Sequence, residues 1–146
     1  MKKSIWLELC CALLILLFAY VSISKFINYP VFFDAMKTQP FPDWMGWFIA
    51  STLPAAELLI AGLLFFDRTR RPALKVALSL MVAFTIYAAL FAFNIIAKKP
   101  CICGGIMEKL TWENHFYINL FFTAISMIGL WLEKHKTNHK AEISIA

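Results

Sequence analysis

The stretch IWLELCCALLILLFAYVSIS, residues 5–24, decides the fold, because its length and polarity leave few alternatives. Glu8 is its only charged residue, and a membrane-spanning helix needs roughly 20 predominantly apolar residues. A membrane-spanning strand would be shorter and would alternate apolar with polar residues, which this stretch does not do. The sequence therefore predicts a helix that crosses a lipid bilayer.

Three further apolar runs of similar length follow, at about 44–66, 73–97 and 114–132, and the connections between the runs carry prolines and charges. The chain is 61% hydrophobic with a mean hydropathy of +0.70, which is more apolar surface than a soluble domain of 146 residues can bury. We therefore predict an all-α fold class, an integral membrane four-helix bundle that forms a single domain over residues 1–146 and is surrounded by membrane lipid.

The first connection, KFINYPVFFDAMKTQPFPD at 25–43, has an amphipathic pattern. Its apolar residues Phe32, Phe33 and Met36 fall on one helical face, and charged residues fall on the other. This pattern predicts a short helix that lies in the membrane interface. An ordered loop anchored by its aromatic residues is the alternative.

Basic residues indicate how the bundle is oriented. With four spans, the termini and the second connection share one side, and that side carries nine of the 14 basic residues: Lys2, Lys3, Arg68, Arg70, Arg71, Lys75, Lys134, Lys136 and Lys140. Positive charge resists translocation, so we expect cytoplasmic termini in a bacterial inner membrane and an external connection at 98–113. Because these residues flank apolar runs rather than form a stripe, a nucleic-acid partner is not expected.

A cleaved signal peptide is the competing interpretation of the first run. Lys2 and Lys3 precede the run, and the small-residue pattern of Ser22 and Ser24 follows it. However, the run is longer than the roughly 7–15 apolar residues of a signal peptide, and Glu8 interrupts it.

The external connection contains the pattern KKPCICGG, in which Cys101 and Cys103 flank one isoleucine. A disulfide between them would close a small, strained ring, and strained, exposed disulfides exchange readily. Lys98 and Lys99 favour the reactive thiolate, and the two glycines that follow leave room for a partner's backbone. The pattern predicts a redox pair that passes electrons to or from another protein.

Two other interpretations of the pair stay open. Cys101 and Cys103 could form a static staple or idle thiols in a non-catalytic membrane scaffold. Together with Met107 and His115 they could also form a soft-ligand set for Cu(I), in a copper-binding or transport protein. Enzymatic activity is thus undecided, although thiol-disulfide oxidoreductase activity is favoured.

The cysteines at 10 and 11 are not expected to resolve this pair. They lie near the cytoplasmic end of the first span, at a depth that differs from that of the loop by roughly 20 Å. A disulfide bridges Cα atoms at most about 7 Å apart. We expect Cys10 and Cys11 to pack in the core, with lipidation near the inner interface as an alternative.

A polar group within a span is costly in lipid, so Glu57, in the middle of the second span, draws attention. An unpaired carboxylate there is expected to be protonated, beside a kink at Pro54. Lys25, at the outer end of the first span, could extend outward or turn inward toward Glu57. The acid could carry protons, bind a quinone head group, or only bridge helices by hydrogen bonds. No cofactor is certain, and quinone is the one candidate.

Further polar residues could complete a pocket around this acid, namely Tyr20, Tyr87 and Asn94. His115 and Asn119 share one face of the fourth span, and His115 lies at the level of the loop cysteines. We consider His115 a candidate proton relay; the alternative is an interfacial histidine without a task.

The sequence resembles the MauE family of methylamine utilisation, within the wider DoxX-like group of four-helix membrane proteins associated with redox chemistry. The matching segments are SKF at 24–26, LPAAELLIAGLLF at 53–65, CICGG at 101–105 and NHFYINL at 114–120. They occur in the family's order and spacing over nearly the whole chain.

The resemblance implies an integral membrane protein that works with an exported thioredoxin-like partner in disulfide handling outside the cytoplasm. In methylamine utilisation, the process implied is maturation of the disulfide-rich subunit of methylamine dehydrogenase. By position, Cys101 and Cys103 match the family's redox pair, Glu57 its second-span acid and Lys25 its first-span lysine. The oligomeric state and the direction of electron flow are not defined by the sequence.

Overall fold

The computed structural model describes the backbone of residues 2–96 and 111–145 and the side chains of residues 5–96 and 111–136. Every regular element in this part of the chain is a helix: α1 (Lys2–Ile27), α2 (Tyr29–Lys37), α3 (Asp43–Phe65), α4 (Asp67–Ala92) and α5 (Trp112–Ile145). Four segments of the described chain are long and apolar enough to cross a membrane, namely Ile5–Ile27, Asp43–Phe65, Asp67–Ala92 and Trp112–Lys136. The predicted all-α membrane bundle is confirmed.

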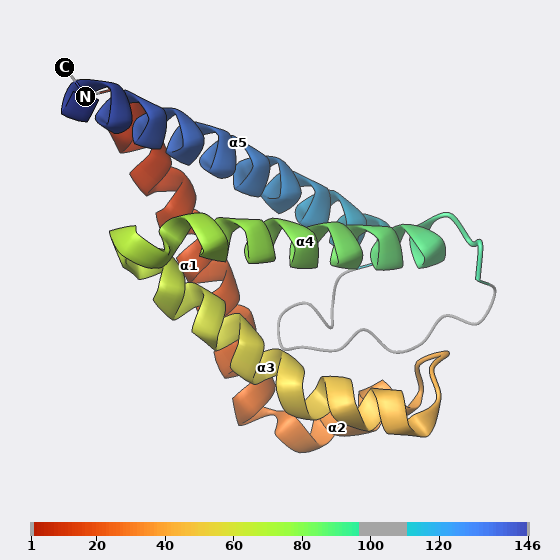
Figure 1. The fold of residues 1–146 in the computed structure, drawn as a ribbon. Helices are drawn as coiled ribbons and strands as arrows, with labels where there is room; N and C mark the ends of the chain where they lie inside the picture. The colour runs from red at the N-terminus through yellow and green to blue at the C-terminus, as the bar shows by residue number, and fades with distance from the viewer. Residues whose placement is uncertain (1, 97–110, 146) are drawn as a thin grey trace.

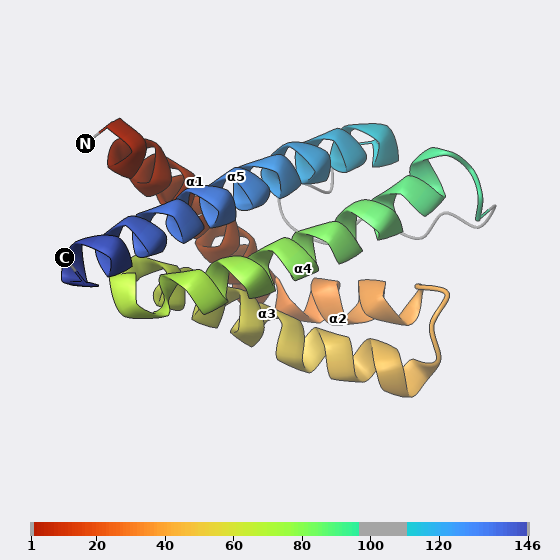
Figure 2. The same cartoon turned by 45° about the horizontal axis from the view of Figure 1, so that its top comes forward.

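The long helices close into a bundle, because α1 and α4 each pack against both α3 and α5 (Figures 1 and 2). The start of α1, the α3–α4 junction and the end of α5 lie together at one end, which we call the Phe66 end (Figure 1). The other end, which we call the Trp112 end, holds α2, the end of α4 and the start of α5 (Figure 1). The first and last described helices therefore begin and end beside the second connection, as a four-span chain requires.

The α3–α4 junction differs from the expected connection, because the charged segment after Phe66 is the beginning of α4 rather than a loop. Phe66 alone is extended, with φ −94° and ψ 127°. The Thr69 hydroxyl donates to the Leu63 carbonyl at 2.7 Å, and Arg70 Nε donates to the Leu64 carbonyl at 3.4 Å. These bonds satisfy carbonyls in the last turn of α3 that have no partner within that helix. The tight corner is therefore held by side chains that the sequence pattern assigns to a loop.

The end of α4 also differs from the predicted span, which reached residue 97. The helix ends at Ala92, and Asn94 has a φ of 54°, in the left-handed region where a helix cannot continue. Asparagine tolerates this conformation better than most residues. Asn94 is exposed.

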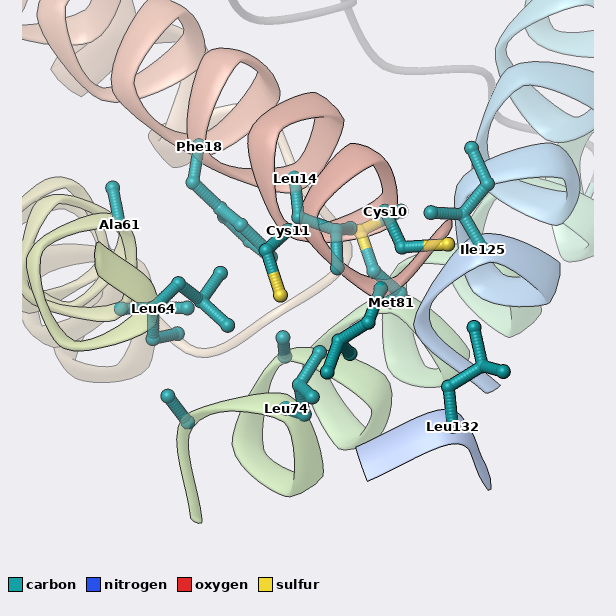
Figure 3. Close-up of a cluster of buried hydrophobic side chains, with 14 residues drawn as sticks. Cys10, Cys11, Leu14, Phe18, Ala61, Leu64, Leu74, Met81, Ile125 and Leu132 are labelled. Carbon is teal, nitrogen blue, oxygen red and sulfur yellow. The ribbon is translucent and has the colours of Figure 1, made fainter. Parts of the chain in front are cut away.

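The core lies toward the Phe66 end and includes both cysteines of α1 (Figure 3). The Cys10 side chain points toward Ile125 on α5, whereas the Cys11 side chain points toward Leu64 on α3 (Figure 3). Both thiols are free and buried. Small side chains let α1 approach two neighbouring helices here, which agrees with the packing role expected for the two cysteines.

The first connection contains the short helix predicted from its amphipathic pattern. Pro30 lies in the first turn of α2, where a missing N–H costs no hydrogen bond. Phe32 is buried, while Asp34 and Lys37 form an exposed ion pair at 3.0 Å. The helix lies against α3 at Gly46, where an added Cβ would be 3.1 Å from the Met36 carbonyl oxygen. Glycine thus permits the close approach of α2 to α3.

Candidate functional site

A buried ion pair joins α1 to α3. Lys25 Nζ lies 2.6 Å from Glu57 Oε1, and the two residues are 5% and 0% exposed. The sequence left open whether the Lys25 side chain extends outward or turns inward, and in the structure it turns inward toward Glu57. Glu57 is therefore paired, whereas the expectation of a protonated acid was made for an unpaired carboxyl. A contact this short is typical of a charge-assisted hydrogen bond between ammonium and carboxylate.

A second contact fixes the same face of both helices. The Ser22 hydroxyl donates to the Pro54 carbonyl at 2.7 Å, three residues before the ion pair on each helix. Residues three apart share a helix face, so the side chains of Ser22, Lys25 and Glu57 and the Pro54 carbonyl form one polar seam within apolar helices. Lys25 Nζ also lies 5.4 Å and 5.8 Å from the ring centroids of Phe32 and Phe84. Such rings attract a cation and shield it from lipid.

The ion pair borders a cavity of about 130 Å³, to which all five helices contribute. Tyr20 and Tyr87 line it, as the sequence pattern proposed for a polar pocket, and His115 and Asn119 line it as well. Asn94 is not among the lining residues, because it follows the end of α4. Since Met36 and Trp112 line the cavity as well, it lies toward the Trp112 end.

The first turns of α5 place His115 at this cavity. Trp112 packs against Phe91 of α4 with ring centroids 4.6 Å apart, and His115 packs against Trp112 at 6.1 Å. One turn further, Asn119 Nδ2 donates to the Phe84 carbonyl at 3.4 Å. The predicted common face of His115 and Asn119 is therefore the face that α5 turns toward the cavity.

Two buried polar atoms at the cavity lack a hydrogen-bond partner among the described residues. They are Glu57 Oε2 and His115 Nδ1. Buried polar atoms in native structures are nearly always satisfied, by protein, water or ligand. Because the two atoms come from different helices that meet at one cavity, the arrangement is suited to holding a small polar ligand.

The residues predicted to carry the redox chemistry, Cys101 and Cys103, lie outside the described residues, and so does Met107. Of the soft-metal set, only His115 is described. No group of three or more histidine, cysteine or acidic side chains suited to a metal occurs within the part of the chain that the structure describes. The helix ends that flank the cysteine-containing connection lie at the Trp112 end, where the cavity is (Figure 1).

Sequence reasoning missed a second ionic cluster, at the Phe66 end. Arg70 is 4% exposed; its Nη1 and Nη2 donate to the two carboxylate oxygens of Glu8 at 2.8 Å and 3.2 Å. Arg70 Nη1 also lies 2.6 Å from Asp67 Oδ1, and Lys136 Nζ lies 3.7 Å from the same oxygen. The only signal in the sequence was Glu8 itself, an acid near the end of an apolar run. It indicated an interruption of the span rather than a partner.

Sequence reasoning also missed Gln39, which is buried and accepts a hydrogen bond from the Tyr87 hydroxyl. Gln39 Nε2 donates to the Ala35 carbonyl at 3.2 Å, so this side chain links the end of α2 to α4 beside the cavity. Pro40 and Pro42 follow Gln39 in the sequence, and nothing in that pattern marks it as a buried residue.

Four helices of membrane-spanning length around a buried polar seam define an integral membrane protein with a small polar site inside its bundle. A family model described as Methylamine utilisation protein MauE matches residues 3–132, and the chain belongs to this family. The match covers all four candidate membrane spans except the last turn of α5's span. Neither a curated protein nor a solved structure matches the chain.

Proposed function

We propose that the protein is a membrane thiol-disulfide redox protein that exchanges electrons with an exported thioredoxin-like partner. Cys101 and Cys103 are the proposed redox pair. The observation that carries the proposal is the position of the helix ends that flank their connection, because these ends lie at the end of the bundle where Lys25, Glu57 and His115 line a cavity. Membership of the MauE family and the close spacing of the two cysteines add support.

The proposed reaction is a reversible exchange. A thiolate of the pair attacks the partner's disulfide, forms a mixed disulfide and releases one partner thiol. The second thiolate of the pair then displaces the partner's other sulfur. The products are a disulfide in this protein and a dithiol in the partner, and two electrons have moved. A second carrier must then restore the starting oxidation state of the pair, by reducing its disulfide in this direction or oxidising its dithiol in the other. For an integral membrane protein, the simplest such carrier is a molecule dissolved in the membrane.

The proposal includes an orientation in the bacterial inner membrane, with both termini in the cytoplasm and the cysteine-containing connection outside. The excess of basic residues at the Phe66 end supports this orientation, because cytoplasmic segments retain lysine and arginine. An oxidising compartment is also where a working disulfide persists. The name of the family connects it with methylamine utilisation, so a disulfide-containing exported protein of methylamine oxidation is the proposed client.

Trapping of the mixed disulfide tests the proposal. In cells, Cys103→Ser or Cys101→Ser should accumulate a covalent adduct with an exported protein, because the thiol that resolves the intermediate is gone. The adduct should disappear on reduction and in the doubly substituted chain. Cys10→Ala is the matched control, since Cys10 is buried in the core and should leave the wild-type pattern unchanged.

Two outcomes would contradict this function. One is the absence of an adduct from both single variants, together with a wild-type pair that stays in one redox state under all growth conditions. That result would make the pair a static staple. The other is bound copper that is lost from both Met107→Leu and the serine variants, which would indicate a metal site.

A further inference from the structure

The cavity beside the Lys25–Glu57 pair has the size of one small ring. Its volume is about 130 Å³. For comparison, an apolar protein cavity of roughly 150 Å³ binds a benzene molecule. A six-membered ring therefore fills this space, with substituents directed toward its opening.

The walls of the cavity are mostly apolar and include flat surfaces. Phe18, Phe32, Phe84 and Trp112 contribute aromatic rings, and Met81 contributes a polarisable thioether. Such side chains pack well against another aromatic or quinoid ring. Tyr20 also lines the cavity, although it is 45% exposed and belongs to a membrane-spanning segment. The wall on α1 therefore continues to the lipid-facing surface, from which a lipid-soluble ring can enter.

The charges at the cavity favour a neutral ligand. The Lys25 ammonium and the Glu57 carboxylate are 2.6 Å apart and cancel each other, so the pair offers no net charge to attract an ion. An ionic ligand would also lose its hydration in this apolar setting without compensation. A ring with neutral oxygen substituents avoids both penalties.

The two unsatisfied atoms define the polar groups that such a ring must carry. A carboxylate oxygen such as Glu57 Oε2 only accepts hydrogen bonds, so it requires a donor on the ligand. His115 Nδ1 can donate or accept, according to its tautomer. A ring that bears a hydroxyl on each of two opposite carbons provides a donor to Glu57 and a second oxygen for His115.

We propose that this cavity binds the ring of a lipid-soluble para-quinone, and that it binds the quinol form more tightly than the quinone form. A quinol hydroxyl donates to Glu57 Oε2, and the second ring oxygen contacts His115 Nδ1. In the oxidised ring, a carbonyl oxygen would face the carboxylate oxygen, and two acceptors cannot bond to each other. The protein thereby favours the reduced ring.

The role of this ring rests on the proposed thiol function. When a dithiol reduces the quinone, both S–H bonds are lost, one S–S bond forms and the two ring carbonyls become two hydroxyls. Two electrons and two protons move from sulfur to the ring. In the opposite direction, the quinol reduces a disulfide and the same atoms balance. Within the site, preferential binding of the quinol favours the step from the thiols to the bound ring, which accompanies the reverse of the partner exchange written above, with the partner's dithiol reducing the pair.

Binding is tested without any thiol chemistry. The full chain carrying Cys101→Ser and Cys103→Ser is placed in lipid nanodiscs and titrated with tetramethyl-para-benzoquinone or its quinol, and empty nanodiscs provide the background. We expect saturable binding with a quinol affinity roughly tenfold above that of the quinone, the difference that one buried hydrogen bond makes. In protein labelled with ¹⁵N at its three histidines, the quinol should shift the side-chain signal of His115 and leave that of His135 in place.

Three variants distinguish polar recognition of the ring from nonspecific filling of an apolar cavity. His115→Phe keeps the bulk of the ring and should weaken quinol binding by about tenfold. Glu57→Gln should abolish the preference for quinol, because the amide can present an N–H where the carboxylate presented an acceptor. Thr123→Val is the matched control, two turns beyond His115 on the same face of α5 and outside the cavity lining. It should bind like the parent chain.

Several results would overturn the proposal. These are the absence of saturable binding, equal affinity in His115→Phe and the parent, and equal binding of tetramethylbenzene, which has the ring and no oxygens. Because these chains lack Cys101 and Cys103, a failure here leaves the trapping experiment intact. Conversely, failure to trap a partner leaves the ring site standing.

Discussion

Two buried cations, Arg70 and Lys25, occur among the side chains that the structure describes, and the carboxylates paired with them differ in how completely their surroundings satisfy them. At the Phe66 end, Arg70 bonds both carboxylate oxygens of Glu8 and contacts Asp67 and the Leu64 carbonyl. The Glu8 and Asp67 side chains are 53% and 76% exposed, so water can complete their remaining bonds. Near the Trp112 end, the side chains of Lys25 and Glu57 are only 7% and 1% exposed, and one carboxylate oxygen has no partner among the described residues.

The difference separates an ionic cluster that builds the fold from one that is suited to binding. The arginine cluster closes a helix corner, and none of its members, Glu8, Asp67, Arg70 and Lys136, lines the cavity. The Lys25–Glu57 pair is buried and borders the cavity, so the Glu57 oxygen that has no partner among the described residues is available to a ligand. Partly satisfied buried networks are costly, and a ligand that completes the network recovers that cost.

Removal of one member of the Lys25–Glu57 pair should have the largest effect. We expect Lys25→Met to lower the free energy of unfolding by about 3–5 kcal/mol, because it leaves the Glu57 carboxylate buried without its counter-ion. Unfolding in mixed detergent micelles, followed by circular dichroism, measures the loss.

The matched control for this change is the double variant Lys25→Met and Glu57→Leu. It removes both charges and should recover most of the stability while still failing to bind the quinol. If Lys25→Met alone is as stable as the wild type, the pair contributes nothing to the stability of the fold. The proposed difference between the Lys25–Glu57 pair and the Arg70 cluster would then be wrong.

The arginine cluster should respond more mildly. We expect Arg70→Met to cost about 1–3 kcal/mol, since the corner loses its bonds while water solvates the exposed carboxylates of Glu8 and Asp67. The same unfolding assay gives the stability change, and nanodisc titration gives the affinity for the quinol. That affinity should stay at the wild-type value. An affinity lowered as strongly as in His115→Phe would show that the two ends do not act separately.

Substitution of two glycines of α3 tests how tightly the helices pack at each end of the bundle without changing any charge. We expect Gly46→Ala to destabilise by about 1 kcal/mol, since the added Cβ meets the Met36 carbonyl oxygen and pushes α2 away from the cavity. Gly62, near the Phe66 end, has nothing within 4 Å of an added Cβ, so Gly62→Ala should be neutral or stabilising by roughly 0.5 kcal/mol. Thermal unfolding in detergent measures both changes. An equal effect of the two substitutions would refute close α2–α3 packing as the cause.

The sequence predicted the four-helix membrane class because long apolar runs admit few alternatives in lipid. It also predicted the common face of His115 and Asn119, since four-residue spacing places two side chains on the same side of a helix. The amphipathic helix α2 followed from its pattern in the same way. These features depend on local spacing alone.

The remaining features depend on contacts between distant residues. Lys25 and Glu57 are 32 positions apart, and a lysine near a helix end can point outward or inward with equal local plausibility. The charges after Phe66 are typical of a loop, yet they form a helix because Thr69 and Arg70 find carbonyls at the end of α3. A single sequence does not contain this information, since the deciding partner lies on another helix.

The single-residue corner at Phe66 has a consequence for biosynthesis. Glu8 leaves the ribosome 62 residues before Arg70, so the first helix enters the membrane with an acid that has no counterpart yet. Helices α3 and α4 are too closely joined to insert independently, and they arrive as one hairpin whose tip carries the missing guanidinium. The ionic cluster can therefore form only when the hairpin docks beside α1 with its tip on the side of Glu8. A hairpin inserted the other way leaves both charges unmatched.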